Sequence, residues 1–173
     1  MMLIALTSAA RVQTIHRLTV NNMVKGKDEF VFEFSGLLKQ SRPGFKCSPV
    51  HMKAYPPDRR LCIFHVIKEY LARTERIRKC DSLLISFIKP YGEVSKDTIA
   101  RWLKTIMQRA GIDISKFSAH SIRAAATSKA IQHNVPMDEI LKTAGWSNSG
   151  TFAKFYHKDI HTSDKIEKFC GNS

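Results

Sequence analysis

The chain has 173 residues, of which 43% are hydrophobic, so it suits one domain with its own core and is not expected to be disordered. Its 28 Lys and Arg outnumber 15 Asp and Glu, and the net charge of +13 favours a polyanionic partner such as nucleic acid, although ribosomal and membrane-surface proteins are also basic. No apolar run reaches the ~18 residues of a membrane-spanning helix, and the four cysteines form no CxxC pair or zinc pattern, which favours a reducing compartment.

The first helix is expected over residues 2–18, with a weak point at Thr7 and Ser8. Its apolar start has no basic stretch before it, and a polar segment with Arg11 follows at once. We therefore interpret this segment as a core helix and not as a signal peptide.

A small antiparallel sheet is expected next. Residues 30–34 (FVFEF) have the aromatic and valine composition of a strand. Residues 39–44 (KQSRPG) contain a Pro-Gly pair typical of a turn, and residues 47–52 could return as a second strand.

Helices dominate from about Pro57 onward. Apolar side chains between residues 61 and 71 form one face of a helix, whereas the apolar run 83–87 is ambiguous between strand and loop. Ser95 begins a helix that Gly111 ends.

Three further helices follow: one capped by Ser118 over residues 119–133, one from Pro136 to Ala144 that Gly145 ends, and one capped by Ser149 over residues 151–160. The expected fold class is mainly α with a small antiparallel β-sheet (α+β). It spans residues 1–160, and a polar tail follows over residues 161–173.

The segment FSAHSIRAAA holds the most informative pair of side chains. His120 and Arg123 lie three residues apart near a helix start, so both are expected to project from one face. Backbone N–H groups at a helix N-terminus favour an anion, and an arginine can donate two hydrogen bonds to one phosphate. The pair is a candidate phosphate clamp, although a capping histidine beside a solvated arginine would have the same sequence.

Tyr156 is the candidate nucleophile. It follows Trp146 by ten residues, and Lys154, His157 and Lys158 surround it with positive charge that favours a phenolate. Taken singly, both aromatic residues would be interpreted as core packing.

Two more cations complete the candidate set. Arg11 stands in an otherwise apolar helix, where an unpaired buried charge would be costly, so a specific role is plausible. Lys39 stands at the predicted sheet turn, from which a lysine can swing into a site, although an ordinary turn lysine is the simpler interpretation of that residue alone.

Together these residues resemble the catalytic set of the tyrosine recombinases, the phage-integrase-like proteins. That family has an arginine in an early helix, a lysine in a β-hairpin, HxxR at a helix start, a His or Trp after a glycine and a tyrosine about ten residues later. Here the order is Arg11, Lys39, His120, Arg123, Trp146 and Tyr156. The amino-acid sequence around these residues is most similar to that of recombinases of eukaryotic DIRS- and Crypton-type mobile elements.

Two features depart from the family pattern. Thr14 stands where the family often has an acidic residue, three positions after the arginine. The separate N-terminal clamp domain of the family is missing from the sequence, so we expect the chain to begin part-way into the first helices of a catalytic domain.

The resemblance implies DNA recombination or integration through a 3′-phosphotyrosyl intermediate. Tyr156 would attack a phosphodiester, Arg11, Arg123, His120 and Trp146 would stabilise the developing charge, and Lys39 would protonate the leaving 5′-oxygen. It also implies no metal ion and no other cofactor. The implied partner is double-stranded DNA, bound by a homotetramer, with residues 161–173 as a candidate segment for docking onto a neighbouring protomer. No membrane and no small-molecule substrate are implied.

Three alternatives remain open from the sequence. A non-catalytic DNA-binding domain derived from a mobile-element recombinase would have the same charge. A type IB topoisomerase shares the chemistry, although the short chain and the position of Trp146 favour a recombinase. A small basic helical protein would have the set by coincidence. The expected location is intracellular, nuclear in a eukaryote and otherwise cytoplasmic.

Overall fold

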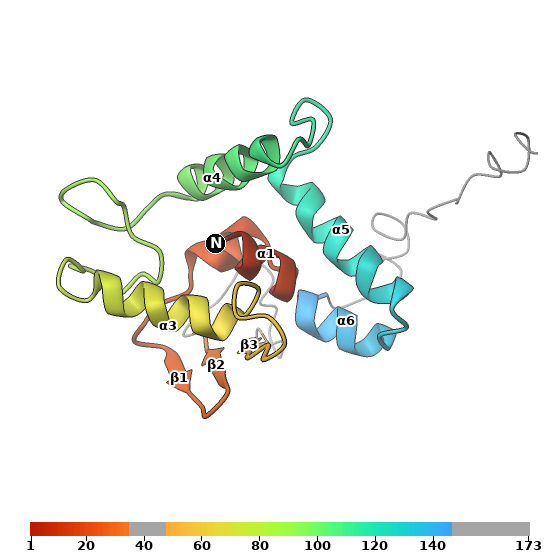
Figure 1. Cartoon of the computed structure of the whole chain (residues 1–173), viewed down its shortest axis with the longest axis horizontal. Coiled ribbons are helices and arrows are strands. Elements are labelled where there is room, and N and C mark those ends of the chain that lie inside the picture. Colours follow the sequence, from red (N-terminus) through yellow and green to blue (C-terminus); the bar gives the residue numbers. More distant parts are fainter. Residues whose placement is uncertain (35–47, 147–173) are drawn as a thin grey trace, which may run out of the picture.

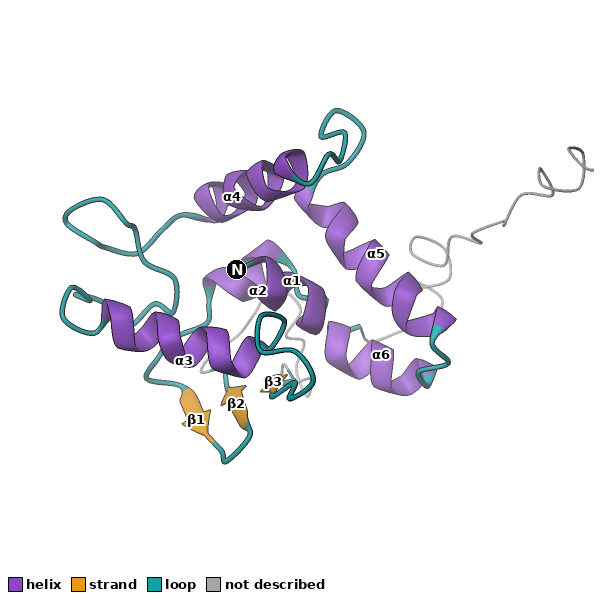
Figure 2. Cartoon of the chain, viewed as in Figure 1, coloured by secondary structure: helices purple, strands orange, loops and turns teal. Residues whose placement is uncertain are grey.

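The structure is a computed structural model that describes residues 1–34 and 48–146. Figures 1 and 2 show helices packed around a central N-terminal segment, with a small sheet at one side. The described helices are α1 (Met2–Ser8), α2 (Val12–His16), α3 (Ile63–Thr74), α4 (Lys96–Arg109), α5 (Ala119–Gln132) and α6 (Met137–Ala144). The strands are β1 (Met23–Lys25), β2 (Glu29–Phe32) and β3 (Val50–Lys53).

The sheet is antiparallel with the order β1-β2-β3, so the prediction of a small antiparallel sheet is confirmed. Phe30 and Phe32 of β2 and Val50 and Met52 of β3 are buried, which gives the alternation expected of a sheet with one face on a core. Strand β1 was not predicted, because three residues with a lysine carry too little pattern. The predicted turn over residues 39–44 lies outside the described residues.

The predicted single helix over residues 2–18 is wrong. Ala9 has the left-handed backbone angles φ 47° and ψ 27°, which end α1, and a new helix begins after Arg11. The hydroxyl of Ser8 competes for backbone groups at this point: it donates to the Ile4 carbonyl at 2.6 Å and accepts from Ala10 N–H at 3.3 Å. Arg11 therefore caps a helix start and does not lie inside a helix.

The later helices follow their predicted end signals. The side chain of Ser95 accepts from Thr98 N–H at 3.1 Å at the start of α4. Gly111 and Gly145 adopt positive φ just after α4 and α6, where a left-handed residue ends a helix. The ambiguous run 83–87 forms only an isolated bridge between Ile85 and Glu93 and is otherwise loop. The predicted helix over residues 151–160 lies outside the described residues.

Two buried clusters hold the described part of the chain together. The larger includes Ile15, Phe32, Leu83 and Leu103 and joins the sheet to α1, α2, α3 and α4. The smaller is formed by Ala9, Ile140, Ala144 and Trp146. Helix α1 contacts α2, α3, α5 and β3, so the α1–α2 break lies between the two clusters. Within residues 1–34 and 48–146, no helix is long and apolar enough to cross a bilayer.

Candidate active site

Arg123 is the buried centre of the candidate site. Its residue exposure is 2%, in the second turn of α5. One guanidinium nitrogen, Nη1, donates to the Ala9 carbonyl at 2.8 Å, and the guanidinium carbon lies 4.0 Å from the centre of the Trp146 ring. A hydrogen bond on one side and an aromatic face on the other fix both the position and the plane of this cation.

The N-terminus of α5 is fixed by a reciprocal pair of serines. The Ser118 hydroxyl accepts from His120 N–H at 3.2 Å, and Ser118 N–H donates to the Ser121 hydroxyl at 3.1 Å. This capping box satisfies two of the amides that a helix start leaves without intrahelical partners. It also sets His120 in the first turn of α5, one turn before Arg123.

Arg11 is held through its backbone. It is the N-cap of α2 with extended angles (φ −71°, ψ 152°), and its carbonyl accepts from Thr14 N–H at 2.8 Å and Ile15 N–H at 3.0 Å. Its side chain is half-buried. Thr14, which departs from the family's acidic residue, contributes a backbone contact here.

The pKa of His120 is affected by both arginines. Burial lowers the pKa of His120 below its ordinary value of 6.5, and the positive charges of Arg123 and then Arg11 lower it further. Both arginines are therefore close enough to act on the imidazole. His120 nevertheless lies on the exposed side of α5, whereas Arg123 is buried, so the two differ in exposure although the sequence predicted one shared face.

Trp146 packs in the smaller cluster and also contacts a candidate site residue, while its proposed role as a donor to phosphate stays a prediction. It is 8% exposed and packs with Ala9, Ile140 and Ala144, as a core aromatic would. It also covers the guanidinium of Arg123. Its backbone N–H donates to the Leu141 carbonyl at 2.9 Å, which closes the end of α6 after the left-handed Gly145.

Four of the six predicted site residues thus lie in described parts of the chain: Arg11, His120, Arg123 and Trp146. They come from the α1–α2 break, the start of α5 and the end of α6. Lys39 and Tyr156 lie outside the described residues, so their roles stay predictions. Two guanidinium groups, an imidazole and an indole supply hydrogen-bond donors of the kinds that bind an anion.

Sequence reasoning missed one contributor, the backbone carbonyl of Ala9. Every residue has a backbone carbonyl, so the sequence cannot show which one contributes to a site. The only indication of a break near Ala9 was the weak point predicted at Thr7 and Ser8. Among the described residues, no group of three or more His, Cys, Asp or Glu is arranged to hold a metal ion.

The fold is similar to solved structures of site-specific recombinases and integrases. XerH recombinase bound to difH substrate in a pre-cleavage complex has a TM-score of 0.67 at 17% identity, over 98% of this chain and 43% of that chain. XerA recombinase has a TM-score of 0.67 at 14% identity, over 96% and 53%. A lambda integrase dimer bound to a COC′ core site has a TM-score of 0.58 at 17% identity, over 94% and 42%.

These likenesses show a recombinase catalytic-domain fold, as predicted, and this chain spans about half or less of the length of each protein. The profile of the phage integrase family matches residues 1–161, so the chain belongs to that family. No individual curated protein matches the chain by sequence.

Proposed function

We propose that this chain is the catalytic part of an enzyme that cuts and rejoins DNA strands through a covalent 3′-phosphotyrosyl intermediate. The observation that supports the proposal is that Arg123 donates to the carbonyl of Ala9, two residues before Arg11, and that both arginines lower the pKa of His120, although these residues come from segments far apart in the sequence. Membership of the phage integrase family and the net charge of +13 both support DNA as that anion.

In the proposed reaction the Tyr156 oxygen forms a bond to the phosphorus of a DNA phosphodiester, and the bond from phosphorus to the 5′-oxygen breaks. Lys39 gives its proton to that leaving oxygen, which becomes a 5′-hydroxyl. A 5′-hydroxyl of another strand then attacks the phosphotyrosine, which restores Tyr156 and reseals the DNA without ATP. A substrate with a better 5′ leaving group should therefore rescue Lys39→Ala.

The described cations would stabilise the negative charge that grows on the non-bridging oxygens during attack. A guanidinium has five N–H donors, so the bond from Arg123 to Ala9 is compatible with contacts to phosphate. His120 and the Trp146 indole N–H are the proposed further donors. No metal ion is required in this scheme, because side chains supply the positive charge.

We further propose double-stranded DNA as the substrate and an assembly of four protomers as the active form. Lambda integrase has been solved as a tetramer bound to a Holliday junction, and this chain resembles it at 16% identity and a TM-score of 0.58 over 96% of its length. The proposed docking segment for a neighbouring protomer is residues 161–173. We also propose, from the resemblance of the sequence around the motifs alone, that the chain comes from a mobile element of DIRS or Crypton type and acts in the nucleus of its host.

A second candidate is a DNA-binding domain that grips but no longer cuts. The net charge of +13 supports it equally, because phosphate neutralisation needs no nucleophile.

A denaturing gel distinguishes the two. Purified protein is incubated with a nicked DNA substrate carrying the element's terminal sequence, from which the cut fragment diffuses away. We expect a covalent protein–DNA band that disappears in Tyr156→Phe. Binding by gel shift without any covalent band would support the second candidate, and relaxation of supercoiled plasmid without a specific site would indicate a topoisomerase.

A further inference from the structure

The three-residue break between α1 and α2 serves both arginines of the candidate site. The carbonyl of Ala9 accepts from Arg123 Nη1 at 2.8 Å, and Arg11 begins α2 two residues later. One short segment therefore presents an acceptor to one arginine and carries the other. Any change in the shape of the break would move the two guanidinium groups relative to each other.

Ser8 makes two hydrogen bonds at the break. This side chain is 1% exposed, and its hydroxyl joins the last turn of α1 to the residue after the turn, by donating to Ile4 O at 2.6 Å and accepting from Ala10 N–H at 3.3 Å. Between these two anchors Ala9 adopts φ 47°, a left-handed conformation that is strained for a residue with a Cβ. Something local must offset that strain, and the Ser8 hydroxyl is suitably placed.

Ala9 also contacts the other side of the site. It is 5% exposed and belongs to the small cluster with Ile140, Ala144 and Trp146. Its methyl group packs in the cluster that contains Trp146, while its carbonyl accepts from the guanidinium that lies against the Trp146 ring. The left-handed turn is thus supported on one side by a hydroxyl and on the other by packing.

We infer that Ser8 and Ala9 are positioning residues of the site: the left-handed turn that they form sets the distance between Arg11 and Arg123. The inference assigns no contact with DNA to either residue. It rests on the proposed function for its effect on catalysis but not for its effect on the geometry of the arginines.

The test compares Ser8→Ala with Thr74→Ala in the full chain. Thr74 is a matched control: it is 8% exposed and its hydroxyl also donates to the carbonyl four residues earlier, that of Tyr70, but in α3. Both variants lose a buried hydroxyl and are expected to lower the midpoint of thermal unfolding. Ser8→Cys keeps the volume with a weaker donor and serves if Ser8→Ala does not fold.

The readout is the pKa of the His120 ring, measured by NMR titration. Burial and the charges of Arg123 and Arg11 lower this pKa, so it reports where the arginines stand. We expect the His120 pKa to rise toward its ordinary value in Ser8→Ala and to keep the wild-type value in Thr74→Ala. Adding Ala9→Gly to Ser8→Ala should bring the pKa part of the way back to the wild-type value, because glycine adopts the left-handed turn without strain but lacks the packed methyl group.

An unchanged His120 pKa in Ser8→Ala and Ser8→Cys would overturn the inference, as would an equal shift in Thr74→Ala. A second measurement uses the covalent-complex assay: Ser8→Ala should slow single-turnover cleavage about tenfold with DNA affinity within about twofold. If the wild-type chain forms no covalent complex, the proposed function fails, whereas the NMR comparison still decides the role of Ser8.

Discussion

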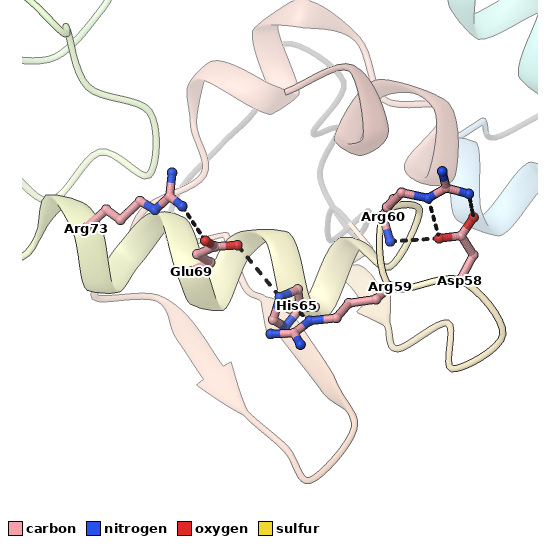
Figure 3. A network of polar contacts seen from close by, with 6 residues as sticks. All are labelled: Asp58, Arg59, Arg60, His65, Glu69 and Arg73. Carbon is pink, nitrogen blue, oxygen red and sulfur yellow. Dashed lines mark hydrogen bonds and ion pairs between the residues drawn. The ribbon is translucent and has the colours of Figure 1, made fainter.

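The chain uses arginines in two contrasting ways. In the candidate site, Arg123 is buried, donates to a backbone carbonyl and lies against an indole ring. Along α3 and the turn before it, arginines are exposed and pair with acidic side chains or a histidine (Figure 3). The residues of that second group are Asp58, Arg59, Arg60, His65, Glu69 and Arg73.

The partners of the α3 group are local in sequence. Arg60 pairs with Asp58 at 3.0 Å and holds the pKa of that carboxyl below its usual range. Arg59 Nε donates to His65 Nε2 at 2.7 Å, and Arg73 pairs with Glu69 one turn away. Such contacts satisfy charge at a solvated surface and add little stability. The contact from Arg123 reaches 114 residues back along the chain, and it fixes a direction in space.

The largest expected difference between the two groups is in cleavage. Arg123→Ala should reduce the rate of covalent-complex formation by about three orders of magnitude or more, with a much smaller loss of DNA affinity, because a transition-state contact is stronger than its ground-state counterpart. Arg73→Ala should leave cleavage near the wild-type rate. Equal losses of binding and cleavage in Arg123→Ala would make this arginine a binding residue.

Trp146 should show a large effect on stability. Trp146→Ala removes the largest side chain of the small cluster and should lower the free energy of unfolding by about 3 kcal/mol or more, measured by urea denaturation. Trp146→Phe keeps an aromatic face for Arg123 and should cost less, yet it removes the indole N–H. If Trp146→Phe cleaves at the wild-type rate, the indole is not a donor to the phosphate.

The contribution of His120 to stability should be modest and should decrease as the pH falls. Since burial, Arg123 and Arg11 lower the folded pKa of His120 below 6.5, the unfolded chain binds more protons below that pH. The His120 contribution is therefore fully present above about pH 6.5 and is lost as the pH falls toward the folded pKa. His120→Gln should remove this component of the unfolding curve, whereas His65→Gln in the α3 group is the matched control. Steeper acid destabilisation in His120→Gln than in wild type would contradict the direction.

The smallest effect should come from the α3 pairs. Glu69 and Arg73 form an ion pair in which both side chains are exposed. Glu69→Gln should therefore change the free energy of unfolding by no more than about 0.5 kcal/mol. Thermal unfolding of wild type and Glu69→Gln at low and high salt measures the contribution of this pair to stability. A loss of more than 1 kcal/mol would mean that the α3 network acts as a unit.

Most helix ends were predictable because their signals are local. Ser95 and Ser118 cap helices and Gly111 and Gly145 end them, each through one residue's own hydrogen bonding or φ preference. The break at Ala9 was not predictable in the same way, since alanine is the best helix former and its left-handed angle depends on Ser8 and on packing from α6.

The site was predicted as a set of residues and not as a geometry. The order of Arg11, His120, Arg123 and Trp146 indicated the family, which the comparisons confirm. The burial of Arg123 could not be inferred, because a helical period cannot say which neighbouring helix covers a residue. The roles of Lys39 and Tyr156 stay predictions that the covalent-complex assay addresses.

The hydrogen bond between Ala9 and Arg123 also bears on how the chain folds. Bringing together residues 114 positions apart closes a loop whose entropic cost is about 4 kcal/mol. The chain loses this entropy before the contact stabilises it. The sheet and α3, whose contacts are closer in sequence, are therefore expected to form earlier. During synthesis the residues of the candidate site would stay separated until α5 has left the ribosome, and a partly made chain would carry no assembled site.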